Sequence, residues 1–159
     1  MKASTRDLFP TTYDVRQTAS SVEYVAHLDR TVVEDGTYFV FEVGDEIVAC
    51  GGWSRRGKLY TGSGDATDDA RLIDPVTEPA RIRAMFTRAD WTRRGLGRRI
   101  LEACEAAARA EGFRALTLGA TMPGLPLYLS FGFHETGRED ILLPDGVRLE
   151  CAWMDKTLD

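Results

Sequence analysis

The chain has 159 residues, of which 43% are hydrophobic and 28% are charged, and its formal net charge is −5 with an isoelectric point near 5.1. This length is enough for one well-buried core and too short for two ordinary domains, so we expect a single domain over residues 1–159. The acidic balance argues against a general nucleic-acid binder, whose binding face would be basic.

Apolar runs and cysteines narrow the class of protein further. No apolar run approaches the roughly 18 residues of a membrane span, and the start of the chain lacks a signal-peptide core, so we expect a cytoplasmic protein with no membrane partner. Cys50, Cys104 and Cys151 lie singly inside apolar patterns, and His27 and His134 are the only histidines. We therefore expect buried, reduced thiols and no metal site.

Residues 1–36 are expected to form a helical N-terminal segment, because the apolar residues from Val15 to Val33 follow a broken helical spacing that predicts one or two helices. Two strands should follow, since Thr37 to Val43 and Glu46 to Trp53 are rich in β-branched and aromatic residues. The Gly44-Asp45 pair between them is typical of a hairpin turn, so the two strands are expected to pair antiparallel.

The segment from Gly57 to Ala80 is rich in Gly, Asp, Thr and Pro, which predicts a long surface loop. Long loops inside compact domains are often functional. A carboxylate-rich rim would attract a cationic amine more than an anionic substrate, although an acidic loop is more often only a solvated surface. The carboxylates of this segment are Asp65, Asp68, Asp69, Asp74 and Glu78.

The second half of the chain is expected to alternate strands with helices. Arg81 to Thr87 is predicted to be a strand, and the apolar stripe from Leu96 to Glu111 predicts a long helix that stops at Gly112. The remaining predicted elements are a strand from Ala115 to Thr121, a short helix from Leu125 to Phe131, and a hairpin of Phe133 to Leu142 with Val147 to Lys156 around Pro144-Asp145-Gly146.

The turn from Arg93 to Arg98, of sequence Arg-Arg-Gly-Leu-Gly-Arg, lies between the predicted strand and the long helix. Gly95 and Gly97 let the backbone approach a ligand, and the first helix amides are unpaired donors at the positive end of the helix dipole. Such a turn suits a pyrophosphate, to which the arginines add charge-assisted bonds. Neither this turn nor the Gly62/Gly64 loop has the P-loop signature, and Ile100 stands where a Rossmann fingerprint needs its third glycine.

Three segments occur in order: Arg83 to Thr87, the glycine turn, and Tyr128 to Phe133 with the sequence Tyr-Leu-Ser-Phe-Gly-Phe. In this order and at this spacing they resemble the GNAT superfamily of acyl-CoA-dependent N-acyltransferases, over about Thr37 to Leu158. The family's turn begins with Gln or Arg, where this chain has Thr92. Most phosphate binding at the turn comes from backbone amides, so the departure removes only one side chain.

The resemblance implies an α/β fold of the mixed α+β kind, in which a central mixed, mostly antiparallel twisted sheet is flanked by helices and splayed between the family's fourth and fifth strands. Residues 37–158 would form this core. It also implies acetyl-CoA as co-substrate and no metal, with the pantetheine arm on fourth-strand backbone and the pyrophosphate on the glycine turn. The residues that would bind the cofactor are Met85, Phe86, Thr87, Arg93, Arg94, Gly95, Leu96, Gly97 and Arg98.

The family's first strand has no counterpart here, because only about 36 residues precede Thr37 and none of Met1 to Leu8 alternates like a strand. Thr37 to Val43 would then lie at a sheet edge with unpaired backbone groups, which invites pairing with another chain or covering by the N-terminal segment. We therefore expect either a homodimer or a start that lies upstream of Met1.

Acyl transfer to an amine needs a neutral amine, a stabilised oxyanion and a proton for the departing thiolate. Tyr128 matches the family tyrosine that protonates the CoA sulfur, since it lies four residues before Gly132-Phe133; a buried ring with a satisfied hydroxyl is the alternative. A backbone amide near Thr87 is the expected oxyanion donor. The predicted strand has no carboxylate, so Glu78 is the nearest candidate base, against the alternatives of a surface carboxylate or a water relay from Asp74 or the main chain.

The sequence thus predicts an N-acetyltransferase that moves an acetyl group from acetyl-CoA directly to a primary amine of a small molecule or a peptide. Trp53 and Tyr60 are candidates for the wall of an acceptor pocket, with a place in the core as the alternative. Two other functions stay open. One is a non-catalytic acyl-CoA-binding or sensing domain, and the other is a binding module for another phosphorylated ligand such as ATP or NAD.

Overall fold

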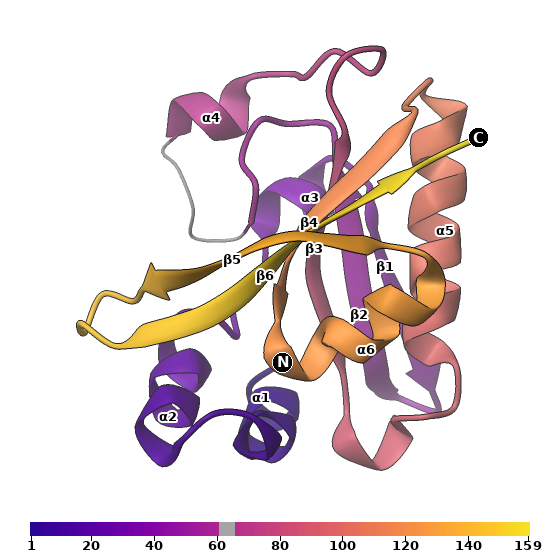
Figure 1. Cartoon of the computed structure of the whole chain (residues 1–159). Helices are drawn as coiled ribbons and strands as arrows, with labels where there is room; N and C mark the ends of the chain where they lie inside the picture. The colour runs from indigo at the N-terminus through magenta and orange to yellow at the C-terminus, as the bar shows by residue number, and fades with distance from the viewer. Residues whose placement is uncertain (61–65) are drawn as a thin grey trace.

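The computed structural model describes residues 1–60 and 66–159, which form one six-stranded sheet covered by helices (Figure 1). Gly62, Gly64 and Asp65, considered above, lie outside the described residues. The strand order across the sheet is β1-β2-β3-β4-β6-β5. The strands are β1 (Tyr38–Val43), β2 (Glu46–Ser54), β3 (Ala80–Thr87), β4 (Ala115–Thr121), β5 (His134–Leu142) and β6 (Arg148–Thr157).

Neighbouring strands pair antiparallel except β3 and β4, which run parallel. The β3–β4 ladder joins Ala80 to Leu116 and Arg81 to Thr117, and the described parts of the two strands do not pair beyond Arg81. The sheet is therefore open between β3 and β4. This mixed, mostly antiparallel and splayed sheet confirms the predicted fold class.

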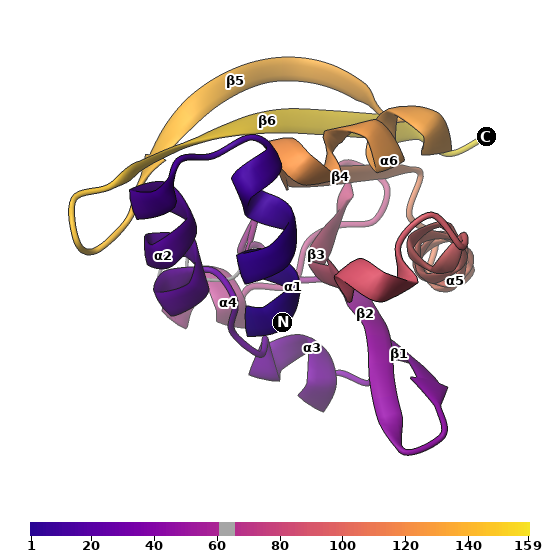
Figure 2. The ribbon, with the colours of Figure 1, turned by 90° about the horizontal axis from the view of Figure 1, so that it is seen from below.

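Helices cover both faces of the sheet, as Figure 2 shows. One side carries α1 (Lys2–Leu8), α2 (Val15–Tyr24) and α3 (Arg30–Glu34), and the other carries α5 (Leu96–Ala110) and α6 (Leu125–Phe131). A short helix, α4 (Ala66–Ala70), lies inside the segment predicted to be a loop. Single 3₁₀ turns occupy Phe9–Thr11, Ala89–Trp91 and Met122–Gly124.

Local capping explains where the N-terminal helices begin. Asp14 and Gln17 exchange side-chain and backbone hydrogen bonds at 2.7 and 3.0 Å, which forms a capping box at the start of α2. Asp29 caps α3 by a single bond, since its carboxylate accepts from the Val32 amide. Two of the helices expected in residues 1–36 are therefore fixed by aspartates that precede them.

The main core lies between the sheet and α5, and a second, smaller core lies between the N-terminal helices and the β5–β6 hairpin. The second core joins parts of the chain that are far apart in sequence. Its buried members are Phe9, Tyr13, Leu143, Val147, Leu149 and Cys151. The three cysteines are all buried and free, and no helix of the described residues is long and apolar enough to cross a membrane.

β1 lies at the edge of the sheet, as expected for a chain without the family's first strand. β1 pairs with β2 on one side, and no described strand pairs with its other side. The N-terminal residues form α1, which contacts β3 through Ser4 rather than lying along β1. The expected homodimer stays a prediction.

Candidate active site

A cavity of about 860 Å³ lies where β3 and β4 separate. Its lining comes from the turn into α5 and from α6, and also from α1, α2 and the tip of the β5–β6 hairpin. Most of the site residues predicted from the sequence meet in this cavity, whereas Arg94 and Glu78 do not line it. Those that do are Met85, Phe86, Thr87, Arg93, Gly95, Leu96, Gly97, Arg98 and Tyr128.

β3 carries a bulge close to the point where it leaves β4. Its register against β2 slips between Cys50 and Gly52, and Ala84 takes a left-handed φ of 54°. The Tyr38 hydroxyl donates to the Ala84 carbonyl oxygen at 3.1 Å and so holds this conformation. Because a bulge bends and twists its strand, it directs Met85 to Thr87 along the wall of the cavity.

The side chain of Met85 packs in the core while its backbone borders the cavity. A Cβ on Gly51 would lie 2.1 Å from the Met85 sulfur, so only glycine leaves room for this side chain between β2 and α5. Met85 therefore has the packing role expected for it, and its backbone contact with a cofactor stays a prediction.

The turn into α5 holds two residues with left-handed backbone, Arg93 with φ of 60° and Gly95 with φ of 78°. Gly95 caps α5, and no atom lies within 4 Å of the position that its Cβ would take, so the space over the helix start is open. Gly97 differs, because its Cβ would lie 2.8 Å from Leu127 on α6. Gly97 thus lets α6 pack close to the first turn of α5 as well as leaving that turn accessible.

The arginines of this turn point in different directions. Arg93 and Arg98 line the cavity, and Arg98 also donates to the Ser130 carbonyl oxygen at 2.8 Å. Arg94 lies over the Trp91 ring, with its guanidinium carbon 4.4 Å from the ring centroid. Two of the three predicted phosphate-binding side chains therefore stand at the cavity, and the third stacks beside it.

Tyr128 lies on α6 and is 8% exposed, with its ring edge-on to Phe133. Burial raises the pKa of Tyr128, and nearby Cys104 adds to the effect, so the hydroxyl keeps its proton at neutral pH. The side chain lines the cavity, and none of the described residues forms a hydrogen bond with its hydroxyl. This arrangement leaves the proton free for a molecule bound in the cavity.

Glu78 is held away from the cavity by its neighbours. Its carboxylate accepts from both terminal nitrogens of Arg71, at 3.0 and 3.1 Å, and from the Asp74 amide at 3.2 Å. The Arg71 bonds first, and then the Asp74 amide, hold the pKa of Glu78 below its usual value. Glu78 also precedes β3, whereas Thr87 ends it, and an eight-residue strand spans about 23 Å. The structure therefore does not bring Glu78 to Tyr128.

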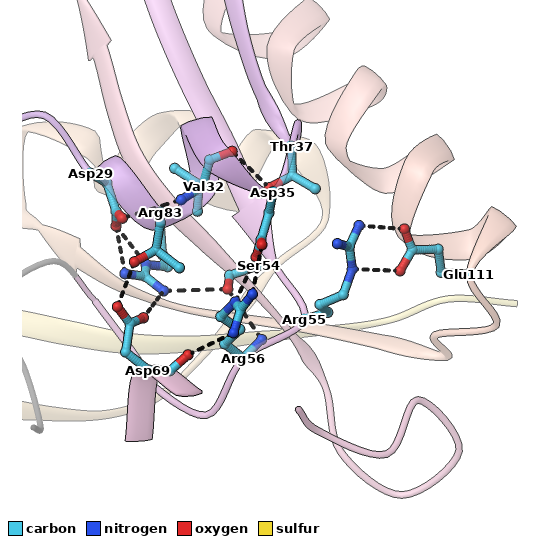
Figure 3. Close-up of polar contacts among 11 residues, drawn as sticks. Asp29, Val32, Asp35, Thr37, Ser54, Arg55, Arg56, Asp69, Arg83 and Glu111 are labelled. Atoms are coloured by element: carbon cyan, nitrogen blue, oxygen red, sulfur yellow. Dashed lines mark hydrogen bonds and ion pairs between the residues drawn. The ribbon is translucent and has the colours of Figure 1, made fainter. Parts of the chain in front are cut away.

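A buried ion-pair network ties β3 to the N-terminal segment and to α4 (Figure 3). The guanidinium of Arg83, whose residue is 3% exposed, pairs with Asp29 at 2.6 Å and with Asp69 at 3.3 Å, and it also donates to the Ser54 hydroxyl. Thr31 on α3 donates to Asp69 as well. Asp69 and Glu78 are therefore ion-paired with Arg83 and Arg71 of the same chain. Neither carboxylate is left unpaired to attract a cationic substrate, in contrast to what the acidic composition of this segment suggested.

Several residues at the cavity were not predicted. Ser4 on α1 donates to the Thr87 carbonyl oxygen at 2.6 Å, a contact across 83 positions of sequence that carries no local signal. Trp153 lines the cavity and stacks on Tyr60, whereas Trp53 is 1% exposed and belongs to the main core. The two-residue spacing of Cys151 and Trp153 along the last strand could have indicated that both lie on one face.

Comparison with known proteins identifies the family. The model of the acetyltransferase (GNAT) domain matches residues 34–135, which is more than half of the chain. The chain therefore belongs to the GNAT family of acetyltransferases, and it is an acyltransferase. No curated protein sequence matches it significantly.

Solved structures share the fold over nearly the whole chain. A GCN5-related N-acetyltransferase from Rhodopseudomonas palustris aligns with a TM-score of 0.73 at 18% identity, covering 99% of this chain and 84% of the other. The PaiA N-acetyltransferase from Thermoplasma acidophilum, in complex with coenzyme A, aligns with a TM-score of 0.62 at 12% identity, covering 98% of this chain and 87% of the other. YncA from Salmonella typhimurium, with its cofactor acetyl-CoA, aligns with a TM-score of 0.61 at 17% identity, covering 99% of this chain and 91% of the other.

Proposed function

We propose that the protein transfers the acetyl group of acetyl-CoA directly to a primary amine of a small molecule or a peptide. The observation that carries this proposal is that one cavity joins the glycine turn at the start of α5, the unpaired edge of β3 and the Tyr128 side chain. PaiA and YncA, which share the fold, were solved with coenzyme A and acetyl-CoA. Their ligands support the same cofactor here.

The residues at the cavity fit acetyl-CoA in shape and charge. The turn over residues 93–98 offers unpaired helix amides and the side chains of Arg93 and Arg98 for a pyrophosphate. The edge of β3 from Met85 to Thr87 lacks a strand partner toward β4, so it can bond to an amide-rich arm as an added strand would. A volume of about 860 Å³ also lies within the usual range for small-molecule sites.

Each chemical requirement of the transfer then has a candidate group. The amine nitrogen attacks the acetyl carbon, the C–N bond forms, and the C–S bond of the thioester breaks. Backbone amides of β3 near Thr87 stabilise the oxyanion of the tetrahedral intermediate. Tyr128 gives its proton to the departing sulfur, which leaves as a neutral thiol, and solvent then restores the phenol.

The amine must also lose a proton, and water is the proposed acceptor. Among the described residues that line the cavity there is no carboxylate and no imidazole. The predicted base, Glu78, is ion-paired with Arg71 and lies beyond the start of β3. We therefore propose that the acceptor attacks as the neutral amine, and that the nitrogen gives up one proton to a water in the cavity once the C–N bond has formed, which balances the proton that Tyr128 gives to sulfur.

The test is release of free thiol from acetyl-CoA across a panel of amines, with the acetylated product identified by mass spectrometry. We expect amine-dependent thiol release and an N-acetylated product in equal amounts. Thiol release that does not depend on amine, or none at all with a cofactor that binds, would contradict acetyl transfer to amines.

The position of Glu78 favours one alternative, a domain that binds acyl-CoA without catalysis. Such a domain would keep the glycine turn and the open β3 edge while lacking a base at the cavity. The protonated hydroxyl of Tyr128 in the cavity speaks against it. Saturable acetyl-CoA binding without thiol release for any amine would decide for this alternative.

A further inference from the structure

We propose that the acceptor is a small primary amine that carries an aromatic group, and that this group binds against an aromatic wall built around Trp153. The wall is defined here by cavity-lining residues, namely Trp153, Tyr60, Phe9, Tyr24, Val25, Ile141 and Leu142. This inference rests on the proposed acetyl transfer and adds the class of acceptor to it.

Trp153 lies on the sheet face that the N-terminal helices cover. Leu118 on β4 points into the main core, and the next residue, Gly119, pairs with Trp153 on β6. Side chains alternate along a strand and cross-strand partners share a face, so Trp153 lies on the face opposite the main core. Cys151, two positions earlier, accordingly packs with Phe9 in the second core.

The indole of Trp153 lies across both neighbouring strands, because each of them has a glycine beside it. Gly119 on β4 and Gly137 on β5 are its pairing partners. A Cβ on Gly119 would lie 2.7 Å from the six-membered ring, and one on Gly137 would lie 3.9 Å from the five-membered ring. The indole nitrogen donates to Glu139 at 3.1 Å, and Tyr60 stacks on the ring at 5.9 Å between centroids. The result is a flat, fixed aromatic surface.

This surface lies level with the place where the transfer would occur. Ala80 pairs with Leu116 in the parallel β3–β4 ladder, and the same register continued three positions along each strand would set Arg83 opposite Gly119; both residues line the cavity. The bulge at Ala84 therefore stands beside the Gly119–Trp153 pair, across the gap between the strands. An amine held on the indole would reach the open edge of β3 from the face opposite to α6, which carries Tyr128.

The rest of the wall is apolar and is anchored independently of any ligand. The Tyr13 hydroxyl donates to the Glu150 carbonyl oxygen at 2.6 Å and accepts from the Met122 amide at 2.9 Å, which fixes the N-terminal segment onto β6. Because these side chains are already ordered without a ligand, less conformational entropy is lost when an acceptor binds. Besides Trp153 and Tyr60, its side chains include Phe9, Tyr24, Val25, Ile141 and Leu142.

The charged residues at the cavity also favour an aromatic acceptor over a polycationic one. The charged side chains among the described lining residues are those of Arg83, Arg93 and Arg98. Arg83 is already paired with Asp29, and the other two stand at the glycine turn. A polycationic acceptor would meet positive charge and gain no ion pair from these residues, whereas an aromatic group would gain contact area and ring stacking.

The experiment compares kcat/KM for three acceptors: phenylethylamine, ethylamine and spermidine. The first two share the reacting amine and differ by the ring, and the third is a polycation. We expect phenylethylamine to exceed ethylamine by about 10- to 100-fold, because a ring of this size is buried on binding, and to exceed spermidine by a similar factor.

Two variants locate the selectivity on the wall. Trp153→Leu is expected to lower the ratio of kcat/KM for phenylethylamine to kcat/KM for ethylamine about tenfold. Tyr60→Ala should act in the same direction if Trp153→Leu does not fold. Leu72→Ala is the matched control, since Leu72 is 64% exposed and does not line the cavity, and it should leave the ratio unchanged.

Calorimetric binding of phenylethylamine in the presence of coenzyme A gives a readout that needs no turnover. Transfer to ethylamine or spermidine at least as fast as to phenylethylamine would overturn the aromatic acceptor and leave the acetyl transfer standing. If both Trp153→Leu and Tyr60→Ala left the ratio of kcat/KM for phenylethylamine to that for ethylamine unchanged, the aromatic acceptor would also be overturned. Binding of phenylethylamine that Tyr60→Ala weakens, without acetylation of any amine, would support the aromatic wall and contradict the proposed function.

Discussion

Tyr128 has the two properties that an acid for the departing sulfur needs, a phenol that carries its proton at neutral pH and a place on the cavity wall. Tyr128→Phe removes the hydroxyl and keeps the ring. We expect kcat to fall by about ten- to a thousandfold, with the acetyl-CoA dissociation constant unchanged. Steady-state kinetics together with calorimetry measure the two quantities, and a wild-type kcat in this variant would remove Tyr128 from the proposed chemistry.

Gly95 and Gly97 are expected to matter for different reasons. Gly97→Val adds a branched side chain against Leu127 and over the helix start, and Gly95→Val strains a turn that needs φ of 78°. We expect each to weaken acetyl-CoA binding by about 10- to 100-fold or more, since backbone bonds to a charged group are lost. Ala106→Val adds the same branching on the exposed side of α5 and should bind normally. Wild-type affinity for acetyl-CoA in both glycine variants would refute the binding of its pyrophosphate at the glycine turn.

Residues of the site could be predicted where their spacing along the chain reflects a local requirement. The glycines of the turn follow from a strand-to-helix turn fixed by nearby sequence, whereas Tyr128 follows from the resemblance of residues 128–133 to the GNAT family. Ser4 and Trp153 were missed because their partners, Thr87 and Gly119, are remote in sequence. Glu78 shows a limit of such reasoning, since nearness to a strand in sequence does not set which end of the strand a side chain reaches.

At the scale of elements, the ion pair between Asp35 and Arg56 links the end of α3 to the segment that follows β2, with two bonds of 2.7 Å. The Arg56 hydrogen bonds hold the pKa of Asp35 below its usual value. A carboxyl whose pKa is lowered on folding stabilises the fold above its unfolded pKa, about 3.9, and loses that contribution as the pH falls through the folded value.

Asp35→Asn is therefore expected to reduce the free energy of unfolding by about 1–2 kcal/mol at pH 7. The difference between the variant and the wild type should shrink as the pH falls below about 4, because the wild-type carboxylate is then protonated. Urea unfolding at pH 7, 4.5 and 3 measures this. A difference that stays constant over this range would show that the pair contributes nothing that depends on charge.

Strands and helices with strong local patterns were predicted well, and elements made by tertiary packing were not. The β1–β2 and β5–β6 hairpins and α5 lie within a residue or two of their predicted ranges. The helix α4 fell in a segment of loop-like composition, and its Asp69 is held by Arg83 and Thr31. Those contacts come from β3 and α3, so no local pattern could indicate them.

At the scale of the whole molecule, the free edge of β1 predicts association. Its outer backbone groups face no described strand, and Val40 and Ile47 nearby are 47% and 53% exposed. An open edge with apolar side chains is a template for pairing with a second chain. We predict a homodimer, measured by light scattering across a range of protein concentrations. A monomer mass at every concentration, with protected β1 amides in hydrogen exchange, would contradict it.

The cavity between β3 and β4 is where the fold, the glycine turn and Tyr128 meet, so binding of acetyl-CoA is the central claim. The most direct test is the thermal unfolding midpoint with acetyl-CoA, coenzyme A, ATP or NAD. A ligand at 100 times its dissociation constant stabilises the native state by about 2.7 kcal/mol, which raises the midpoint by roughly 5–11 °C for a domain of this size. We predict such a rise with acetyl-CoA and coenzyme A and none with ATP or NAD. No rise with either coenzyme A species, or a larger one with NAD or ATP, would contradict the assignment of this cavity.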